Sequence, residues 1–365
     1  MAYSNAGTPV FYVDNYLYRK TIGVVTNSTS TPLADIIVYS DKTHPNLVNM
    51  SPSFSTAFSV NENTSSIYFS IPSRNLSLGN NITDFNLTGN MKIYFAVLNH
   101  NLTTIGMRGT THNSDSIDFT VQNADVGQIL NSDLGNVNKG STIATYDSLI
   151  GENLDNITIL CTQDEGVLPT VGCISTGIQY TMPQSPDLDV SMQIDFDGIN
   201  SITTSGGKSL TNIKYVGNPL WVNGDNKSNP FDIYSDSIDA TQSGERRNGR
   251  RSWNLKFTYL SDTNLFASNQ GATTYAQTLD SDGSIYESDD YDGDYNTMKY
   301  NIDTDDSFYA QVWNKTLGGA LPFIFQPDSN NNDEFYICKF DSSSLSVKQS
   351  AYKVYDVSLK IQEVW

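Results

Sequence analysis

The residues best suited to bind a metal ion are the carboxylates that alternate along Asp290-Tyr291-Asp292-Gly293-Asp294. Calcium prefers oxygen ligands, and calcium loops supply them from alternate positions. The run differs from an EF-hand, because its glycine is the fourth residue rather than the sixth and Asn301 stands where the bidentate glutamate belongs. Asp290, Asp292 and Asp294 are therefore candidate Ca²⁺ ligands. The alternative, which we favour, is a solvated acidic loop without a cofactor.

Four arginines form the basic cluster of an acidic chain: Arg246, Arg247, Arg250 and Arg251. The formal net charge of the chain is −19 and its pI is near 4.3. A surface that binds phosphates needs many clustered Lys and Arg side chains, so we do not expect nucleic acid as a partner. The cluster is instead a candidate contact with an acidic neighbouring subunit. Arginine stems that only cover strand edges are the alternative.

Catalytic constellations are scarce. The three histidines are His44, His100 and His112, and neither an HExxH nor a GxSxG motif occurs. Gly206-Gly207-Lys208-Ser209 resembles the end of a phosphate-binding loop but lacks the first glycine of that motif, so we interpret it as a turn. We predict that the protein is not an enzyme. A carboxylate pair that hydrolyses glycosides stays open as an alternative.

The cysteines and the N-terminal residues indicate in which cellular compartment the protein is expected. Cys161, Cys173 and Cys338 form no CxxC pair, so zinc and redox sites lack their ligands. We favour reduced thiols over a Cys161–Cys173 disulfide. Met1–Thr8 is short and polar and predicts no signal peptide, and no run reaches the roughly 18 apolar residues of a membrane span. We therefore expect no membrane partner.

Short apolar or alternating runs, broken by Asn, Asp, Gly and Ser, indicate strands rather than helices. Six such runs lie in the first half: Val10–Tyr18, Asp35–Tyr39, Ser66–Ile71, Lys92–Leu98, Ser116–Val121 and Ile157–Cys161. Three later runs alternate with a period of two, which predicts antiparallel sheet with one buried face. Their predicted buried residues are Val190, Met192, Ile194 and Phe196; Trp253, Leu255, Phe257 and Tyr259; and Tyr355, Val357, Leu359 and Ile361.

The fold class that follows is mostly β, in two domains divided within Pro183-Gln184-Ser185-Pro186. Residues 1–184 are predicted to form a β-sandwich or jelly roll, and residues 185–365 an antiparallel β domain with one helix. The helix is expected near 305–317, where Asp305, Asp306 or Ser307 would cap its start and Gly318-Gly319 would end it. Residues 261–301 are rich in Asp, Ser and Gly and predict a long acidic loop.

Two parts of the chain resemble virion proteins of tailed bacteriophages. The first is Met91–Leu102, an apolar strand ending in Leu98-Asn99-His100-Asn101-Leu102, whose polar residues we expect to bond local backbone. The second is C-terminal and joins three segments that are similar to minor tail proteins and, most closely, distal tail proteins: Arg250–Phe257, Leu321–Pro327 and Val357–Trp365. The resemblance carries over no site residue.

The resemblance implies a structural role in a virion. The expected function is a tail, baseplate or connector ring protein, made in the bacterial cytoplasm, that assembles with copies of itself and with other tail proteins. Abundant Tyr, together with Trp221, leaves a carbohydrate-binding module of a tail fibre or surface adhesin as one alternative. A tail-associated polysaccharide depolymerase is the other.

Overall fold

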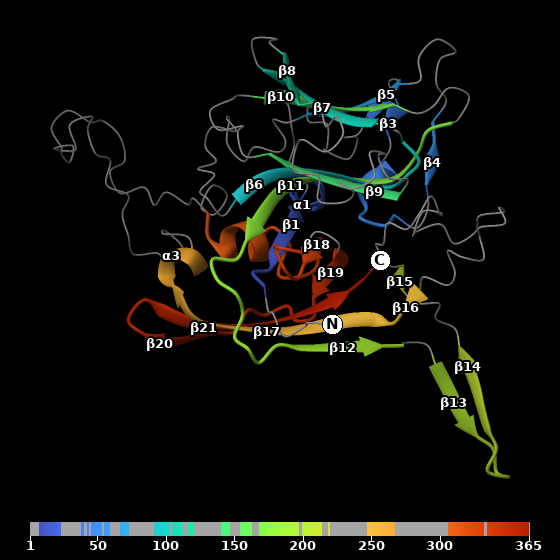
Figure 1. Cartoon of the computed structure of the whole chain (residues 1–365), viewed down its shortest axis with the longest axis vertical. Coiled ribbons are helices and arrows are strands. Elements are labelled where there is room, and N and C mark those ends of the chain that lie inside the picture. The colour runs from blue at the N-terminus through green and yellow to red at the C-terminus, as the bar shows by residue number, and fades with distance from the viewer. Residues whose placement is uncertain are drawn as a thin grey trace.

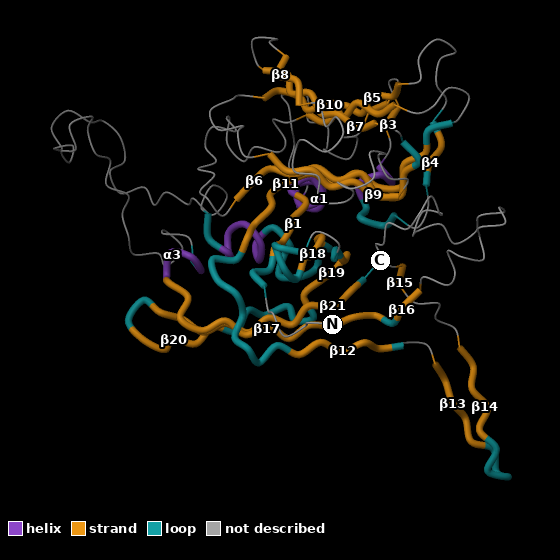
Figure 2. The backbone as a smooth tube through the Cα atoms, in the orientation of Figure 1, coloured by secondary structure: helices purple, strands orange, loops and turns teal. Residues whose placement is uncertain are grey.

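A computed structural model gives the arrangement of the chain. It describes residues 7–22, 38–39, 42–43, 45–52, 55–58, 66–72, 91–102, 104–111, 116–119, 140–146, 154–162, 168–196, 199–213, 218–219, 247–266, 306–331 and 334–364. Strands dominate these residues, and helices are few and short (Figure 2). The prediction of a mostly β fold is confirmed.

The largest element is an eleven-stranded antiparallel sheet (Figure 1). The main path runs in this order: β12 (Ser191–Asp195), β17 (Arg250–Ser261), β21 (Val354–Glu363), β19 (Tyr336–Phe340), β18 (Phe323–Gln326), β1 (Val10–Asp14), β11 (Thr170–Thr181), β6 (Met91–His100) and β9 (Gly140–Tyr146). Off this path, β20 (Val347–Ala351) pairs with β21, and β4 (Thr56–Ala57) pairs with β11.

A six-stranded sheet forms a separate layer beyond β6, β11 and β9 (Figure 1). Its order is β3 (Lys42–Thr43), β2 (Val38–Tyr39), β5 (Ser66–Pro72), β10 (Leu154–Thr162), β7 (Thr104–Thr111) and β8 (Ser116–Phe119). Two further pairs stand apart: β13 (Ile199–Thr203) with β14 (Ser209–Ile213), and β15 (Asn218–Pro219) with β16 (Arg247–Asn248). Each of the six strands predicted in the first half appears, at least in part, at its predicted place.

Strand β1 connects the two halves of the chain. It pairs with β11 on one side, where Phe11 lies opposite Tyr180, and with β18 on the other, where Phe11 lies opposite Phe325. The large sheet therefore contains strands from both 1–184 and 185–365. The polar link between the halves is also attached, because Asp187 N donates to Lys256 O at 2.7 Å. The domain boundary itself stays a prediction.

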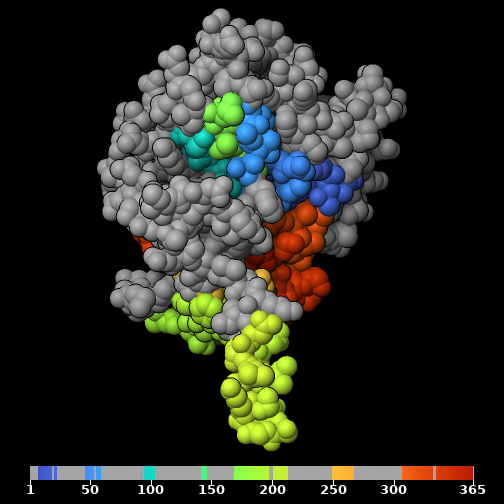
Figure 3. All heavy atoms as spheres, turned by 90° about the vertical axis from the view of Figure 1, so that its right-hand side faces the viewer, coloured from blue at the N-terminus to red at the C-terminus, as the bar shows by residue number. Residues whose placement is uncertain are grey.

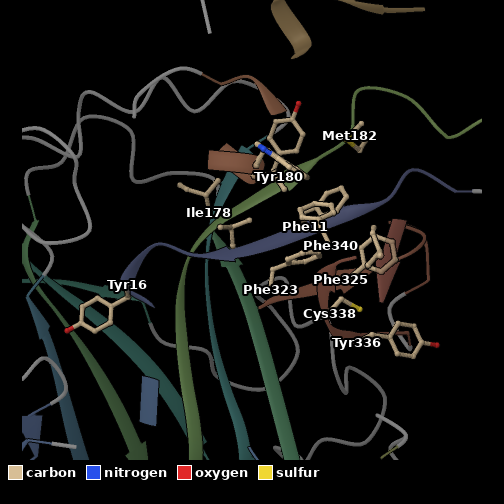
Figure 4. Close-up of a cluster of buried hydrophobic side chains, with 14 of the residues drawn as sticks. Phe11, Tyr16, Ile178, Tyr180, Met182, Phe323, Phe325, Tyr336, Cys338 and Phe340 are labelled. Atoms are coloured by element: carbon tan, nitrogen blue, oxygen red, sulfur yellow. The ribbon is translucent and has the colours of Figure 1, made fainter. Parts of the chain in front are cut away.

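An aromatic cluster fills the core beside β1. The Phe11 ring lies 5.4 to 6.0 Å from four other rings, and Figure 4 shows it among aromatic residues of β18 and β19. The four partners are Phe308, Phe323, Phe325 and Phe340. The neighbouring residue Tyr12 points to the opposite face, where it packs edge-on against Tyr94 at 5.2 Å. Both faces of β1 are therefore buried.

The helices differ from prediction in three places. The predicted strand Val10–Tyr18 is wrong beyond Asp14, because the chain turns there into helix α1 (Asn15–Ile22). The predicted C-terminal helix is present as a π-helix, η4 (Tyr309–Asn314). Just before it, Ser307 Oγ accepts a hydrogen bond from Ala310 N at 3.3 Å. Gly318 and Gly319, both at positive φ, follow it as expected.

The start of the predicted acidic loop is also partly helical. Residues Asp262–Leu265 form the short helix α3, because Ser261 Oγ accepts a hydrogen bond from Asn264 N at 3.3 Å and so caps its first turn. The remainder of the predicted loop, from residue 267 to 301, lies outside the described residues.

The predicted alternation holds along most of the outer strands. Trp253, Leu255 and Phe257 of β17 are buried, as are Val357, Leu359 and Ile361 of β21. Tyr259 is an exception: its φ is +60° and 76% of it is exposed, because a bulge between Phe257 and Leu260 inserts one residue and turns the ring outward. Leu260 takes the buried position instead.

The predicted buried face of β12 is only partly buried. Val190 and Met192 pack against the core, whereas Ile194 and Phe196 are 42% and 57% exposed. Both lie against Gly249, where an added Cβ would be 2.7 Å from Ile194 Cγ2. A glycine has no side chain to cover them, so the apolar face of β12 continues into solvent.

Candidate interaction surface

The β13–β14 hairpin, residues 199–213, projects from the end of the large sheet; we call it the arm (Figures 1 and 3). Ile202 and Leu210 lie opposite each other in the strand register, so they share one face, and they are 67% and 53% exposed. A two-stranded hairpin without a covered apolar face is marginally stable in water. The arm therefore presents apolar surface that gains stability only against another surface.

The face of the arm opposite Ile202 and Leu210 carries hydroxyl side chains that bond to one another, together with the paired residues Ile199 and Ile213. Ser201 Oγ lies 2.9 Å from Ser209 Oγ and 3.2 Å from Thr211 Oγ1 across the two strands. In the turn, Thr204 N donates to Lys208 O at 2.9 Å, and Gly207 has φ +77°. The Gly-Gly-Lys-Ser sequence is thus a hairpin turn followed by a strand, as interpreted from the sequence. Ile202 and Leu210 lie on the other face and are exposed.

Further exposed apolar residues lie at the two ends of β12. Leu188 is 92% exposed before the start of the strand, and Ile194 and Phe196 are 42% and 57% exposed at its end; we call residues 194–196 the edge patch. Among the described strands, β12 pairs only with β17, so its other edge carries unpaired backbone groups. Asp195 lies opposite Arg250 of β17 in the strand register, and Ile194 lies opposite Arg251. Such an edge is a template for another strand.

The arginine candidates divide into two groups. Arg246 lies outside the described residues, and only the backbone of Arg247, in β16, is described. Arg250 and Arg251 begin β17, and the Arg251 guanidinium lies 4.7 Å from the centre of the Tyr336 ring. Arg251 N also donates to Glu363 Oε2 at 2.9 Å. Arg251 therefore packs within its own chain, and a subunit contact through the cluster stays a prediction.

The calcium candidates Asp290, Asp292 and Asp294 lie outside the described residues, as do His44, His112 and Trp221. Within the described part of the chain, no group of three His, Cys, Asp or Glu side chains is arranged to hold a metal ion. Cys173 and Cys338 are free, buried thiols. Asp290, Asp292 and Asp294 remain candidate Ca²⁺ ligands from the sequence alone.

Asp14 is a buried carboxylate at the junction of β1 and α1. Its Oδ1 accepts from Tyr16 N and Leu17 N, both at 2.8 Å, and so caps the helix. Burial raises the pKa of Asp14 to about 7, against the opposing effect of these hydrogen bonds, the nearby Ser175 hydroxyl and the charge of Lys20. Its Oδ2 has no partner of ordinary geometry among the described residues. These contacts make Asp14 a structural group.

The Asn99–Asn101 turn holds three segments together. Asn99, at φ +55°, donates to Pro52 O, while Asn101 accepts from Thr170 N at 2.7 Å. His100 bonds local backbone as predicted, since its Nδ1 accepts from Leu102 N at 3.2 Å. Its Nε2 lies 2.9 Å from Thr142 Oγ1, and burial lowers the pKa of His100 to about 3. The histidine is therefore neutral and structural.

No protein-family model, curated protein or solved structure matches the chain. The described residues also contain no helix long and apolar enough to cross a membrane. Sequence reasoning missed the arm, because its strands carry more Ser, Thr and Asn than apolar residues. The signal was present: two five-residue runs flank a Ser-Gly-Gly turn and contain no acidic residue.

Proposed function

We propose that the chain is a structural subunit of a tailed-bacteriophage virion, in the tail, baseplate or connector, and that it acts by assembling with copies of itself and neighbouring virion proteins. The observation that carries the assembly role is the projecting arm with its exposed Ile202–Leu210 pair. An apolar surface on a weakly supported hairpin is costly for a protein that acts alone. The resemblance of the two sequence regions supports the virion context.

The charge of the chain supports regulated assembly. A net charge of −19 keeps separate copies apart at low ionic strength. At physiological ionic strength the Debye length falls to about 8 Å, so repulsion between acidic surfaces weakens while apolar contacts persist. Assembly of this protein should therefore increase with salt concentration.

The assembly role is tested with the purified full-length chain. We expect light scattering coupled to size exclusion to show a discrete oligomer whose population grows with protein and salt concentration. Negative-stain electron microscopy should then show closed rings. A monomer at every concentration and salt condition would contradict the proposal, and a monomer that binds one glycan selectively on an array would favour the carbohydrate-binding alternative.

The virion context has a separate test. Genes for a portal, terminase or tape-measure protein should flank the coding sequence, because virion genes are arranged together. A secretion operon in their place would overturn the virion context while leaving the assembly role open to the first experiment.

A further inference from the structure

We propose that Asp14 is a proton-controlled latch for helix α1: the neutral carboxyl group holds the helix against strand β11, and loss of its proton favours a state in which the helix is lifted and the carboxylate reaches water. This inference does not depend on the proposed assembly function. Three properties of the junction between β1 (Val10–Asp14) and α1 (Asn15–Ile22) lead to it.

The first property is the way in which the helix is attached. Asp14 Oδ1 accepts from Tyr16 N and Leu17 N, both at 2.8 Å, so one carboxyl oxygen fixes the first turn of α1 to the end of β1. Further along the helix, Lys20 Nζ donates to Asn49 Oδ1 at the long distance of 3.5 Å. A helix of eight residues is marginal in water by itself. Its place on β11 therefore depends on the Asp14 cap and on the burial of Tyr16 and Leu17.

The second property is the environment of the other carboxyl oxygen. Asp14 is 2% exposed, and its Oδ2 has no partner of ordinary geometry among the described residues. Gly177 of β11 lies opposite Asp14 in the strand register, and Tyr94 of β6 lies opposite Gly177. Because the glycine has no side chain, the Tyr94 ring reaches over it and packs against Tyr12 of β1 at 5.2 Å. The Tyr94 hydroxyl lies 2.7 Å from the Ser175 hydroxyl, so neutral groups surround the buried acid.

The third property is the set of titratable and charged groups around the carboxyl group. Among the described residues of the elements packed against Asp14, these groups are Tyr12 of β1, Tyr16 and Lys20 of α1, Tyr94 of β6 and Cys173 of β11. Burial raises the pKa of the three tyrosines and of Cys173, so they stay neutral at physiological pH. The attraction of Lys20 does not offset the burial of Asp14, whose pKa rises to about 7. Asp14 therefore changes charge near neutral pH.

These properties give the junction two states. A neutral Asp14 tolerates burial while Oδ1 keeps the helix cap, so α1 stays on the sheet. An ionised Asp14 is costly to bury, and lifting a short helix lets water reach the carboxylate at a lower cost than unfolding the whole sheet. The open state uncovers Tyr16 and Leu17, which are otherwise buried. The chain therefore presents new apolar surface only as the pH rises.

The latch is tested by hydrogen–deuterium exchange of the full-length chain, measured by mass spectrometry from pH 5 to pH 8 and corrected for the intrinsic pH dependence of exchange. Folding raises the pKa of Asp14 from 3.8 to about 7, so the closed state loses stability as the pH rises between these values. We expect peptides that cover residues 14–22 to lose protection about tenfold from pH 5 to pH 8. Constant protection of these peptides would overturn the latch.

The urea dependence of exchange separates local opening from global unfolding. Lifting α1 exposes little surface, so low concentrations of urea should leave the exchange of residues 14–22 unchanged at each pH. The slowest amides of the large sheet should exchange faster with urea, because they wait for unfolding of the whole sheet. If residues 14–22 followed urea as steeply as those amides, no separate opening of α1 would exist and the proposal would be wrong.

Two variants assign the titration to its group. Asp14→Asn keeps an oxygen for the helix cap and removes the ionisation, so its protection at residues 14–22 should not change with pH. Asp341→Asn is the matched control, because Asp341 is an exposed carboxylate paired with Lys360 at the surface. This control should keep the wild-type tenfold loss. A tenfold loss that persisted in Asp14→Asn would assign the proton to another group and refute the latch.

A third variant, Ser175→Ala, distinguishes a change in titration from damage to the packing. The Ser175 hydroxyl lowers the pKa of Asp14, so its removal should raise that pKa. The pH at which protection of residues 14–22 stops falling should then move to a higher value. If that pH stayed the same as in the wild type, Asp14 would not be the titrating group.

Discussion

Strands at the centre of the large sheet and strands near its end differ in how their residues are buried. In β1 every residue from Val10 to Asp14 is buried, and in β11 ten consecutive residues are. In β17 and β21 buried and exposed residues alternate. The centre is covered on both faces, whereas the end has one face against the core and one in water. Sensitivity to substitution should therefore change from one region to the other.

The largest contrast concerns adjacent residues of one strand. Phe11→Ala and Tyr12→Ala should each lower the free energy of unfolding by about 3–5 kcal/mol, because each removes a buried ring from an opposite face of β1. The adjacent residues of β17 should differ. Leu255→Ala should lower the free energy of unfolding by about 2–4 kcal/mol, whereas Asn254→Ala should lower it by less than about 0.5 kcal/mol. Urea denaturation measures all four. Equal costs for the two β17 variants would break the comparison.

The next contrast uses two glycines. A Cβ on Gly177, in β11, would lie 2.1 Å from Val13 O and 2.7 Å from Asn15 N, and backbone atoms at that junction have no room to move. We expect Gly177→Ala to cost about 3 kcal/mol. A Cβ on Gly206, in the turn of the arm, would meet nothing within 4 Å, so Gly206→Ala should change stability by less than about 0.5 kcal/mol. Thermal melts of the two variants provide the check.

Burial at the centre also predicts a pH dependence. The pKa of Asp14 rises from 3.8 to about 7 on folding, so the folded chain binds more protons than the unfolded chain between these values. The contribution of Asp14 is therefore complete below pH 4 and is lost as the pH rises through 7. Asp14→Asn keeps the helix cap and removes the titration.

The difference in unfolding free energy between wild type and Asp14→Asn should shift by about 2 kcal/mol in favour of the variant from pH 4 to pH 8. This is less than the full pKa shift would give, because water and small movements reach a buried acid. Denaturation of both proteins at several pH values tests this shift. If the free energy of unfolding changed with pH in the same way for the two proteins, the titration of Asp14 would be refuted.

The smallest effect on stability is expected for a substitution on the solvent-exposed face of β17. Lys256 Nζ lies 3.9 Å from Asp187 Oδ2, and the lysine side chain is 53% exposed. Lys256→Ala should cost less than about 0.5 kcal/mol, because exposed ion pairs are screened by water and salt. A loss above about 1 kcal/mol by urea denaturation would show that this face is covered after all.

The same contrast explains what the sequence revealed. Alternation identified the buried residues of β17 and β21, since a strand with one wet face carries a period of two. Strand β1 carries no such period, and its partner β18 is remote: Tyr12 Oη bonds Gln326 Oε1 across 314 positions at 2.8 Å. No local pattern indicates a contact of that range. The bulge that exposes Tyr259 is likewise decided by the partner strand.

The sequence did not predict the candidate interaction surface, for a related reason. Ile194 and Phe196 have the spacing of buried residues, but they lie in solvent beside Gly249, which has no side chain to cover them. The apolar residues of the arm are three apart on each strand and so lack a period of two, and two of them, Ile202 and Leu210, are exposed. A sequence period records which residues share a face and does not record whether that face is covered.

The position of β1 between β11 and β18 has a consequence for synthesis. The ribosome makes Val10–Asp14 early and β18 some three hundred residues later, which at about 5–20 residues per second is an interval of roughly 16–60 s. Throughout that time one side of β1 has no neighbour, and the nascent chain carries an apolar strand that other chains can bind. The synthesis of β18 thus decides when β1 gains its second neighbour in the sheet.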